Sequence, residues 1–115
     1  MPSFSSFKNV SVLCVGDVIL DRYISGKARR LSPEAPIPVV SVDSKHDILG
    51  GAANVAHNIA AAGAKCTLSG VLGEDASGEA FKEAIAQYPS LSPLLFTSAL
   101  RKTTLKTRVV ADHHQ

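Results

Sequence analysis

Residues 50–73 constrain the fold of this chain more than any other stretch. A glycine pair opens an alanine-rich segment that predicts a helix over residues 51–62, and Gly63 ends that helix before an apolar strand over residues 66–72. Such small residues allow a helix to pack closely on a sheet. A glycine-led helix start also suits a small polyhydroxylated ligand held against the backbone, with Asn54 offering both a donor and an acceptor. The two interpretations are compatible.

The order of the other predicted elements indicates an α/β fold. Apolar residues 10–15 are typical of a strand buried on both faces, residues 77–88 of a helix with Ser77 as its N-cap, and residues 94–98 of a weaker strand. Strand, helix, strand, helix and strand in that order predict a parallel sheet with right-handed crossovers. A clearer strand is predicted over residues 103–110.

Two charged, alternating segments differ from this pattern. Residues 22–27 and 37–48 flank the proline-rich residues 31–38. Because proline cannot donate to a central ladder, this region is expected at a sheet edge or in a separate small sheet.

Composition excludes several classes of protein. Hydrophobic residues make up 45% and charged residues 19%, which is enough for a packed core. A formal charge of +2 and the absence of Trp argue against a nucleic-acid partner. No apolar run approaches the ~20 residues that span a bilayer, and the first residues lack the layout of a signal peptide. Cys14 and Cys66 lie in apolar runs without metal-ligand spacing, so we expect them to be small buried side chains and expect no metal site. Together these features predict a cytoplasmic protein.

Two carboxylates follow the first predicted strand. Ligands of parallel α/β sheets bind outside the carboxyl ends of the strands, which is where Asp17 and Asp21 are expected. A carboxylate there can accept hydrogen bonds from neighbouring sugar hydroxyls. Alternatively, it can cap a turn or pair with Arg22 or Arg29.

A basic strand is the second candidate for ligand binding. Alternation places Thr104, Lys106 and Arg108 on one face of the strand predicted over residues 103–110. Two neighbouring cations suit a phosphate group, Arg through a bidentate fork and Lys as a point charge. The alternative is the charged outer face of an edge strand.

The glycine-led stretch resembles a known family. The run GGAANVA at residues 50–56, followed by Gly63 and Gly73, resembles the first signature of the ribokinase-type (phosphofructokinase-B-type) carbohydrate kinases. The segments at residues 16–23 and 30–39 are similar to those of the D-glycero-β-D-manno-heptose 7-phosphate kinases. These kinases occur alone or as the kinase half of a bifunctional heptose kinase/adenylyltransferase.

The resemblance implies a fold and an activity. Residues 1–115 would be the N-terminal portion of a ribokinase-like, three-layer α/β/α kinase domain. Residues 22–48 would form a small β-sheet lid that often pairs between subunits, which implies a homodimer. Such kinases transfer the γ-phosphoryl group of Mg-ATP to a sugar hydroxyl. For the heptose kinases the acceptor is the 1-hydroxyl of D-glycero-D-manno-heptose 7-phosphate, on the route to ADP-heptose and lipopolysaccharide core.

The resemblance also assigns roles to residues of this chain. Asp21 matches the sugar-binding aspartate of the family, and Gly50, Gly51 and Asn54 match its sugar-cradling signature. The basic strand would hold the 7-phosphate of the sugar through Lys106 and Arg108.

The second signature of the family is not found in this sequence. It includes a GxGD segment with the catalytic base, and it is expected beyond Gln115 together with the adenine-binding elements. We therefore expect no nucleotide site within this chain and no kinase activity from it alone. Two alternatives stay open: a family member acting on ribose, fructose or a nucleoside, and a non-catalytic α/β module that dimerises through its proline-flanked strands.

Overall fold

A computed structural model describes residues 4–31 and 38–111 of the chain. Residues 32–37 of the proline-rich segment lie outside the described residues, and so does the side chain of Arg29. Within the described ranges, no helix has the length and apolar character needed to cross a membrane. In chain order the elements are η1 (Phe4–Asn9), β1 (Ser11–Val15), β2 (Val18–Leu31), β3 (Pro38–Gly51), α1 (Ala52–Ala61), β4 (Lys65–Gly73), α2 (Ala76–Ile85), β5 (Leu91–Ser98) and β6 (Thr104–Ala111).

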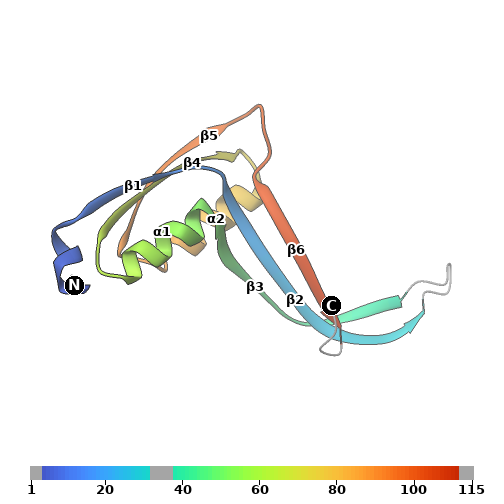
Figure 1. The fold of residues 1–115 in the computed structure, drawn as a ribbon. Coiled ribbons are helices and arrows are strands. Elements are labelled where there is room, and N and C mark those ends of the chain that lie inside the picture. Colours follow the sequence, from blue (N-terminus) through green and yellow to red (C-terminus); the bar gives the residue numbers. More distant parts are fainter. Residues whose placement is uncertain (1–3, 32–37, 112–115) are drawn as a thin grey trace.

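The strands form two 3-stranded sheets. Strands β1, β4 and β5 pair in parallel, with β4 in the centre, and make the sheet of the body. Strands β3, β2 and β6 make the second sheet, here called the lid, in which β2 pairs antiparallel with β3 and parallel with β6. Figure 1 shows the lid leaving the body as a long ribbon, while α1 and α2 lie together on one side of the body sheet.

The lid is larger than the sequence predicts. Its strands β2 and β3 run from Val18 to Leu31 and from Pro38 to Gly51, beyond the predicted residues 22–48. It also includes β6, which pairs with β2 over eight positions from Ile19↔Thr104 to Gly26↔Ala111. Side chains alternate with a period of two in every β-sheet. Periodicity could therefore identify β6 as a strand, but it could not assign β6 to the lid.

The hydrophobic core lies between the body sheet and the two helices. The buried residues of α1 are all alanines, whose small side chains let this helix lie close to the sheet. From α2 the core receives Phe81 and Ile85. The base of the lid shares the same core, because Leu20 and Leu49 of its strands are buried there. Cys66 is buried as predicted, and desolvation raises the pKa of its thiol.

The other face of the body sheet is bare. The register places on it five exposed apolar side chains: Leu13, Val15, Val71, Leu94 and Phe96. The prediction that the first strand is buried on both faces is therefore wrong for this chain. Of the three layers expected for an α/β/α domain, the described residues supply the sheet and one helical layer (Figure 1).

Two phenylalanines distinguish the covered face from the bare one. We expect Phe81→Ala to lower the free energy of unfolding by about 3–5 kcal/mol, because it leaves a cavity in the core. Phe96 is 56% exposed, and its replacement by Ala is expected to cost less than about 1 kcal/mol. Urea unfolding followed by circular dichroism measures both values. Equal losses for the two variants would contradict a bare outer face.

Candidate functional site

One face of the lid gathers the charged residues that the sequence singles out. Residues directly opposite one another on paired strands point to the same face of a sheet. Two neighbouring rows cross the three strands of the lid in register: Ile48, Asp21 and Lys106, then His46, Tyr23 and Arg108. The carboxylate and both predicted cations, which come from separate segments of the chain, therefore share one face.

The carboxylate of Asp21 has no hydrogen-bond or ionic partner among the described residues. Its side chain is half-buried and lies over Gly50, because a Cβ atom added to Gly50 would clash with Asp21 Oδ2. Among residues 4–31 and 38–111, no donor forms a hydrogen bond or ion pair with this carboxylate, although Lys106 is its neighbour in the register. A carboxylate with free lone pairs is a ready acceptor for hydroxyl groups. Asp21 and Gly50 are thus in contact, and their shared role in a sugar site stays a prediction.

Arg108 is held against an aromatic pair. Its guanidinium carbon lies 5.7 Å from the centroid of the Tyr23 ring, and that ring stacks on His46 with centroids 5.4 Å apart. Its Nε is buried and has no hydrogen-bond partner in the described part of the chain. A buried donor without a partner is costly unless a ligand accepts from it. Lys106, one row away, is exposed and also free of an ion pair within that part.

The aromatic pair was not predicted from the sequence. Tyr23 and His46 lie in the two alternating segments on either side of the proline-rich residues, and both segments were identified as strands. Their stacking depends on the exact register of β2 against β3, which includes two irregularities, at Ser25/Gly26 and at Ala28/Arg30. Alternation alone does not determine that register.

The opposite face of the lid carries an ion pair. Arg22 Nε lies 2.9 Å from Asp47 Oδ1, and the side chains of both residues are only about a fifth exposed, 18% and 22%. The hydrogen bond to Asp47 raises the pKa of Arg22. The interpretation that pairs Arg22 with Asp17 or Asp21 is therefore wrong. Because Arg22 is engaged on the other face, Asp21 stays available.

The start of α1 is built on backbone groups. Gly51 is the N-cap residue with φ 59°, a left-handed conformation that favours glycine, and it has no side chain to accept a capping hydrogen bond. The N–H of Ala52 donates to the carbonyl of Asp17 at 2.8 Å, which joins the first turn of α1 to the first residues of the lid. Asn54 is exposed in that first turn, and its amide has no hydrogen-bond partner in the described ranges. Its predicted role in ligand binding stays a prediction.

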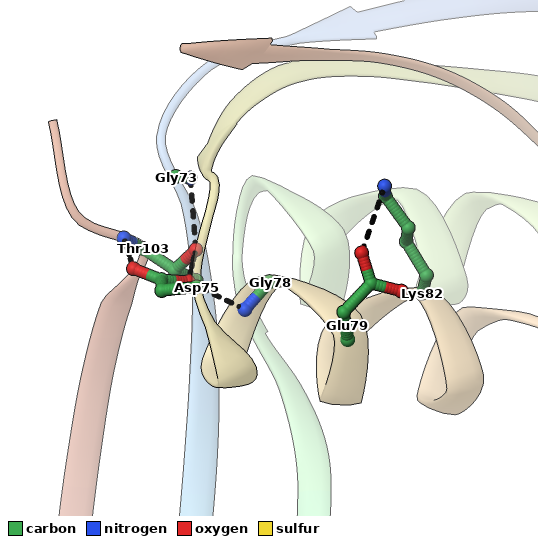
Figure 2. A network of polar contacts seen from close by, with 6 residues as sticks. All are labelled: Gly73, Asp75, Gly78, Glu79, Lys82 and Thr103. Carbon is green, nitrogen blue, oxygen red and sulfur yellow. Dashed lines mark hydrogen bonds and ion pairs between the residues drawn. The ribbon is translucent and has the colours of Figure 1, made fainter. Parts of the chain in front are cut away.

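A second polar network joins the lid to the body (Figure 2). Asp75, not the predicted Ser77, is the N-cap of α2, and its Oδ1 accepts from the N–H of Gly78 at 2.8 Å. The same oxygen accepts from the hydroxyl of Thr103 at 2.7 Å, while Oδ2 accepts from the N–H of Thr103 at 2.9 Å. The Thr103 hydroxyl oxygen in turn accepts from the N–H of Gly73 at 2.9 Å. These hydrogen bonds, those from Thr103 foremost, lower the pKa of Asp75.

The fold and this face together define a class of protein. The chain matches the model of the pfkB family carbohydrate kinases over residues 9–88, and it belongs to that family. A carbohydrate kinase from Agrobacterium tumefaciens has a similar structure, with a TM-score of 0.67, 24% identity and an overlap of 89% of this chain and 32% of that chain. Phosphofructokinase-2 from Escherichia coli in complex with fructose-6-phosphate gives a TM-score of 0.63 at 20% identity, with an overlap of 90% and 31%. At these identities the structural likeness establishes the fold.

The chain is closer in sequence to several curated proteins. It is 46% identical over 110 residues to the bifunctional protein HldE of Caulobacter sp. (strain K31), and 47% identical over 103 residues to that of Rhodopseudomonas palustris (strain BisB18). The matches cover 96% and 90% of this chain but 22% and 21% of the relatives. The chain thus spans about a fifth of the length of these relatives. The predicted membership of the ribokinase-type carbohydrate kinases is confirmed.

The Asp75 network makes stability depend on pH in the acid range. Because the pKa of Asp75 in the folded state lies below its ordinary value of 3.8, its stabilising effect is present above that value and is lost as the pH falls through the lowered pKa. Asp75→Asn has no titrating group at this position. The difference in free energy of unfolding between the unaltered chain and this variant should therefore shrink as the pH falls from about 5 to about 2. Urea unfolding at several pH values measures this difference. A difference that does not change with pH would contradict a stabilising role for the ionised Asp75 carboxylate.

Proposed function

We propose that this chain is the sugar-phosphate-binding part of an ATP-dependent kinase that phosphorylates the 1-hydroxyl of D-glycero-D-manno-heptose 7-phosphate. The observation that carries the proposal is that Asp21, Lys106 and Arg108 share one face of the lid and have no ionic partner among the described residues. The identity of 43% or more to bifunctional HldE proteins supports the same assignment. The product would be the 1,7-bisphosphate on the route to ADP-heptose and lipopolysaccharide core.

The rows of the lid suit the two ends of such a substrate. Asp21 would accept hydrogen bonds from sugar hydroxyls, while Gly50, Gly51 and the amide of Asn54 would line the sugar at the start of α1. Arg108 lies one row beyond Asp21, a step of two residues or about 7 Å along a strand. That spacing suits a sugar whose phosphate is far from its reacting hydroxyl, with the phosphate between Lys106 and Arg108.

The nucleotide half of the reaction would come from other groups. Among the described residues, no three His, Cys, Asp or Glu side chains are grouped so that they could hold a metal ion. Phosphoryl transfer depends on charge stabilisation around both substrates. The proposed role of the described residues is therefore to bind and orient the acceptor. The catalytic base and the ATP site would lie outside them.

The lid would also exclude water and join two subunits. A kinase must keep water from the transferred group, and a sheet that covers the sugar serves this purpose. On the face away from Asp21, Leu105 and Val109 are 38% and 44% exposed, which supports pairing with the lid of a second copy. We propose a homodimer on this basis. We also propose that the enzyme is cytoplasmic, where the ATP that it would use is present.

A binding experiment tests the proposal. Titration calorimetry with D-glycero-D-manno-heptose 7-phosphate should give a saturable complex with this chain. Lys106→Ala should weaken it about tenfold, or about 1.4 kcal/mol, because a phosphate loses one cation. The affinity for heptose without phosphate should not change. Thr107→Ala, on the other face of the same strand, is the matched control and should bind as the unaltered chain does.

Other outcomes would favour the alternatives. Equal affinity for ribose or fructose with no preference for a distal phosphate would argue for another substrate within the family. A tight dimer without affinity for any sugar phosphate would argue for a non-catalytic module. Either result would overturn the heptose 7-phosphate assignment.

A further inference from the structure

Strand β6 lies at the edge of the lid, where β2 is its one neighbour among the described strands. Residues 99–102 that lead into it are all exposed. Residues 104–107 of the strand are also exposed. A strand without a buried face has a weakly specified register, because no hydrophobic pattern opposes slippage. The ladder with β2 and the contact of Arg108 with Tyr23 hold β6 to the lid, and a contact to the body can further fix the position at which Lys106 lies beside Asp21.

Thr103 supplies such a contact directly before the strand. It is the one buried polar side chain within the described ranges, at 7% exposure, and both its N–H and its hydroxyl donate to Asp75. Asp75 is fixed in turn at the start of α2, and Gly73 at the end of β4 donates to the Thr103 hydroxyl. The residue before β6 is therefore tied to two elements of the body (Figure 2).

The glycines of this junction make the approach possible. A Cβ atom on Gly73 would lie 2.7 Å from the nitrogen of Thr103, and one on Gly78 would lie 3.0 Å from its hydroxyl oxygen. Both distances are too short for ordinary contact. The backbone of the body thus meets Thr103 at a distance that a side chain would prevent.

A helix cap alone does not account for Asp75. Capping requires one acceptor for Gly78, and a serine or threonine would supply it. The second carboxylate oxygen and the bond from the hydroxyl are directed to Thr103 instead. Two of the three hydrogen bonds that the carboxylate of Asp75 accepts therefore come from Thr103, directly before the strand that carries the cations.

We propose that Asp75 and Thr103 are positioning residues that set the register of β6 against β2 and so hold Lys106 beside Asp21. The functional consequence rests on the proposed binding of a sugar phosphate at that face. A slip of β6 by two residues would keep its face but move Lys106 away from Asp21 by about 7 Å.

A spin-label distance tests the register without reference to activity. Labels attached through a genetically encoded keto amino acid at Glu83 on α2 and Thr107 on β6, both exposed, leave Cys14 and Cys66 unmodified. Asp75→Ser keeps a helix cap but is too short to reach Thr103. Thr103→Val keeps the shape and removes the hydroxyl. Both should broaden the distance distribution or shift it by up to about 7 Å.

Two variants serve as controls in the same background. Thr103→Ser restores the hydroxyl and should restore the narrow distribution. Glu79→Gln removes the exposed ion pair with Lys82 on the same helix, at 3.4 Å, and should change nothing. Unchanged distributions in Asp75→Ser and Thr103→Val would overturn the proposal. If Thr103→Val does not fold, Asp75→Ser, which retains the cap, gives the same comparison.

Affinity then tests the consequence. Asp75→Ser and Thr103→Val should weaken binding of the heptose 7-phosphate about tenfold and leave binding of the unphosphorylated heptose unchanged, with rescue by Thr103→Ser. A shifted distance with unchanged affinity would overturn the functional part of the inference. If the unaltered chain binds no sugar phosphate, the proposed function fails, and the distance distributions still decide the register.

Discussion

The lid meets the body at two junctions, and at both of them a glycine lets two stretches of backbone approach more closely than a side chain permits. At the first, Gly51 at φ 59° sits against the carbonyl of Asp17, and the same carbonyl accepts from the first N–H of α1. At the second, Gly73 and Gly78 close around Thr103. Among its described side chains, the lid has little core of its own beyond Val18, Leu20 and Leu49 at its base. The position of the lid relative to the body therefore depends on these close backbone contacts. The positions of the charged side chains on the lid depend on them too.

The two faces of the lid use charge in different ways. Arg22 and Asp47 neutralise each other on one face at 2.9 Å. On the other face Asp21, Lys106 and Arg108 have no ionic partner in the part of the chain that the structure describes, and Arg108 is held by the ring of Tyr23 instead. Such an arrangement gives up the stabilisation of an ion pair. It is the pattern expected where hydroxyl and phosphate groups of a ligand complete the contacts.

The sequence predicted the body better than the lid. Helices α1 and α2 and the strands of the body follow from glycine breaks and apolar periodicity, which act over a few neighbouring residues. The lid depends on register between distant strands, so its full extent, the place of β6 and the stacking of Tyr23 on His46 were not predictable in the same way. The sequence analysis assigned the N-cap of α2 to Ser77 instead of Asp75, because serine and aspartate are both favoured N-cap residues. The contact with Thr103, which distinguishes Asp75, comes from a distant segment of the chain. The apolar run of β1 predicts burial on both faces, but among the described residues no element packs on the face of Leu13 and Val15.

The most direct test of the account locates the sugar phosphate on the chain. In ¹⁵N-labelled protein titrated with D-glycero-D-manno-heptose 7-phosphate, the largest backbone shifts should fall at Asp21, at Gly50 to Asn54 and at Lys106. Those residues come from three segments that meet only at the proposed site. Shifts confined to the apolar groove lined by Tyr88, Pro89 and Leu95, or no shifts at saturating ligand, would contradict it.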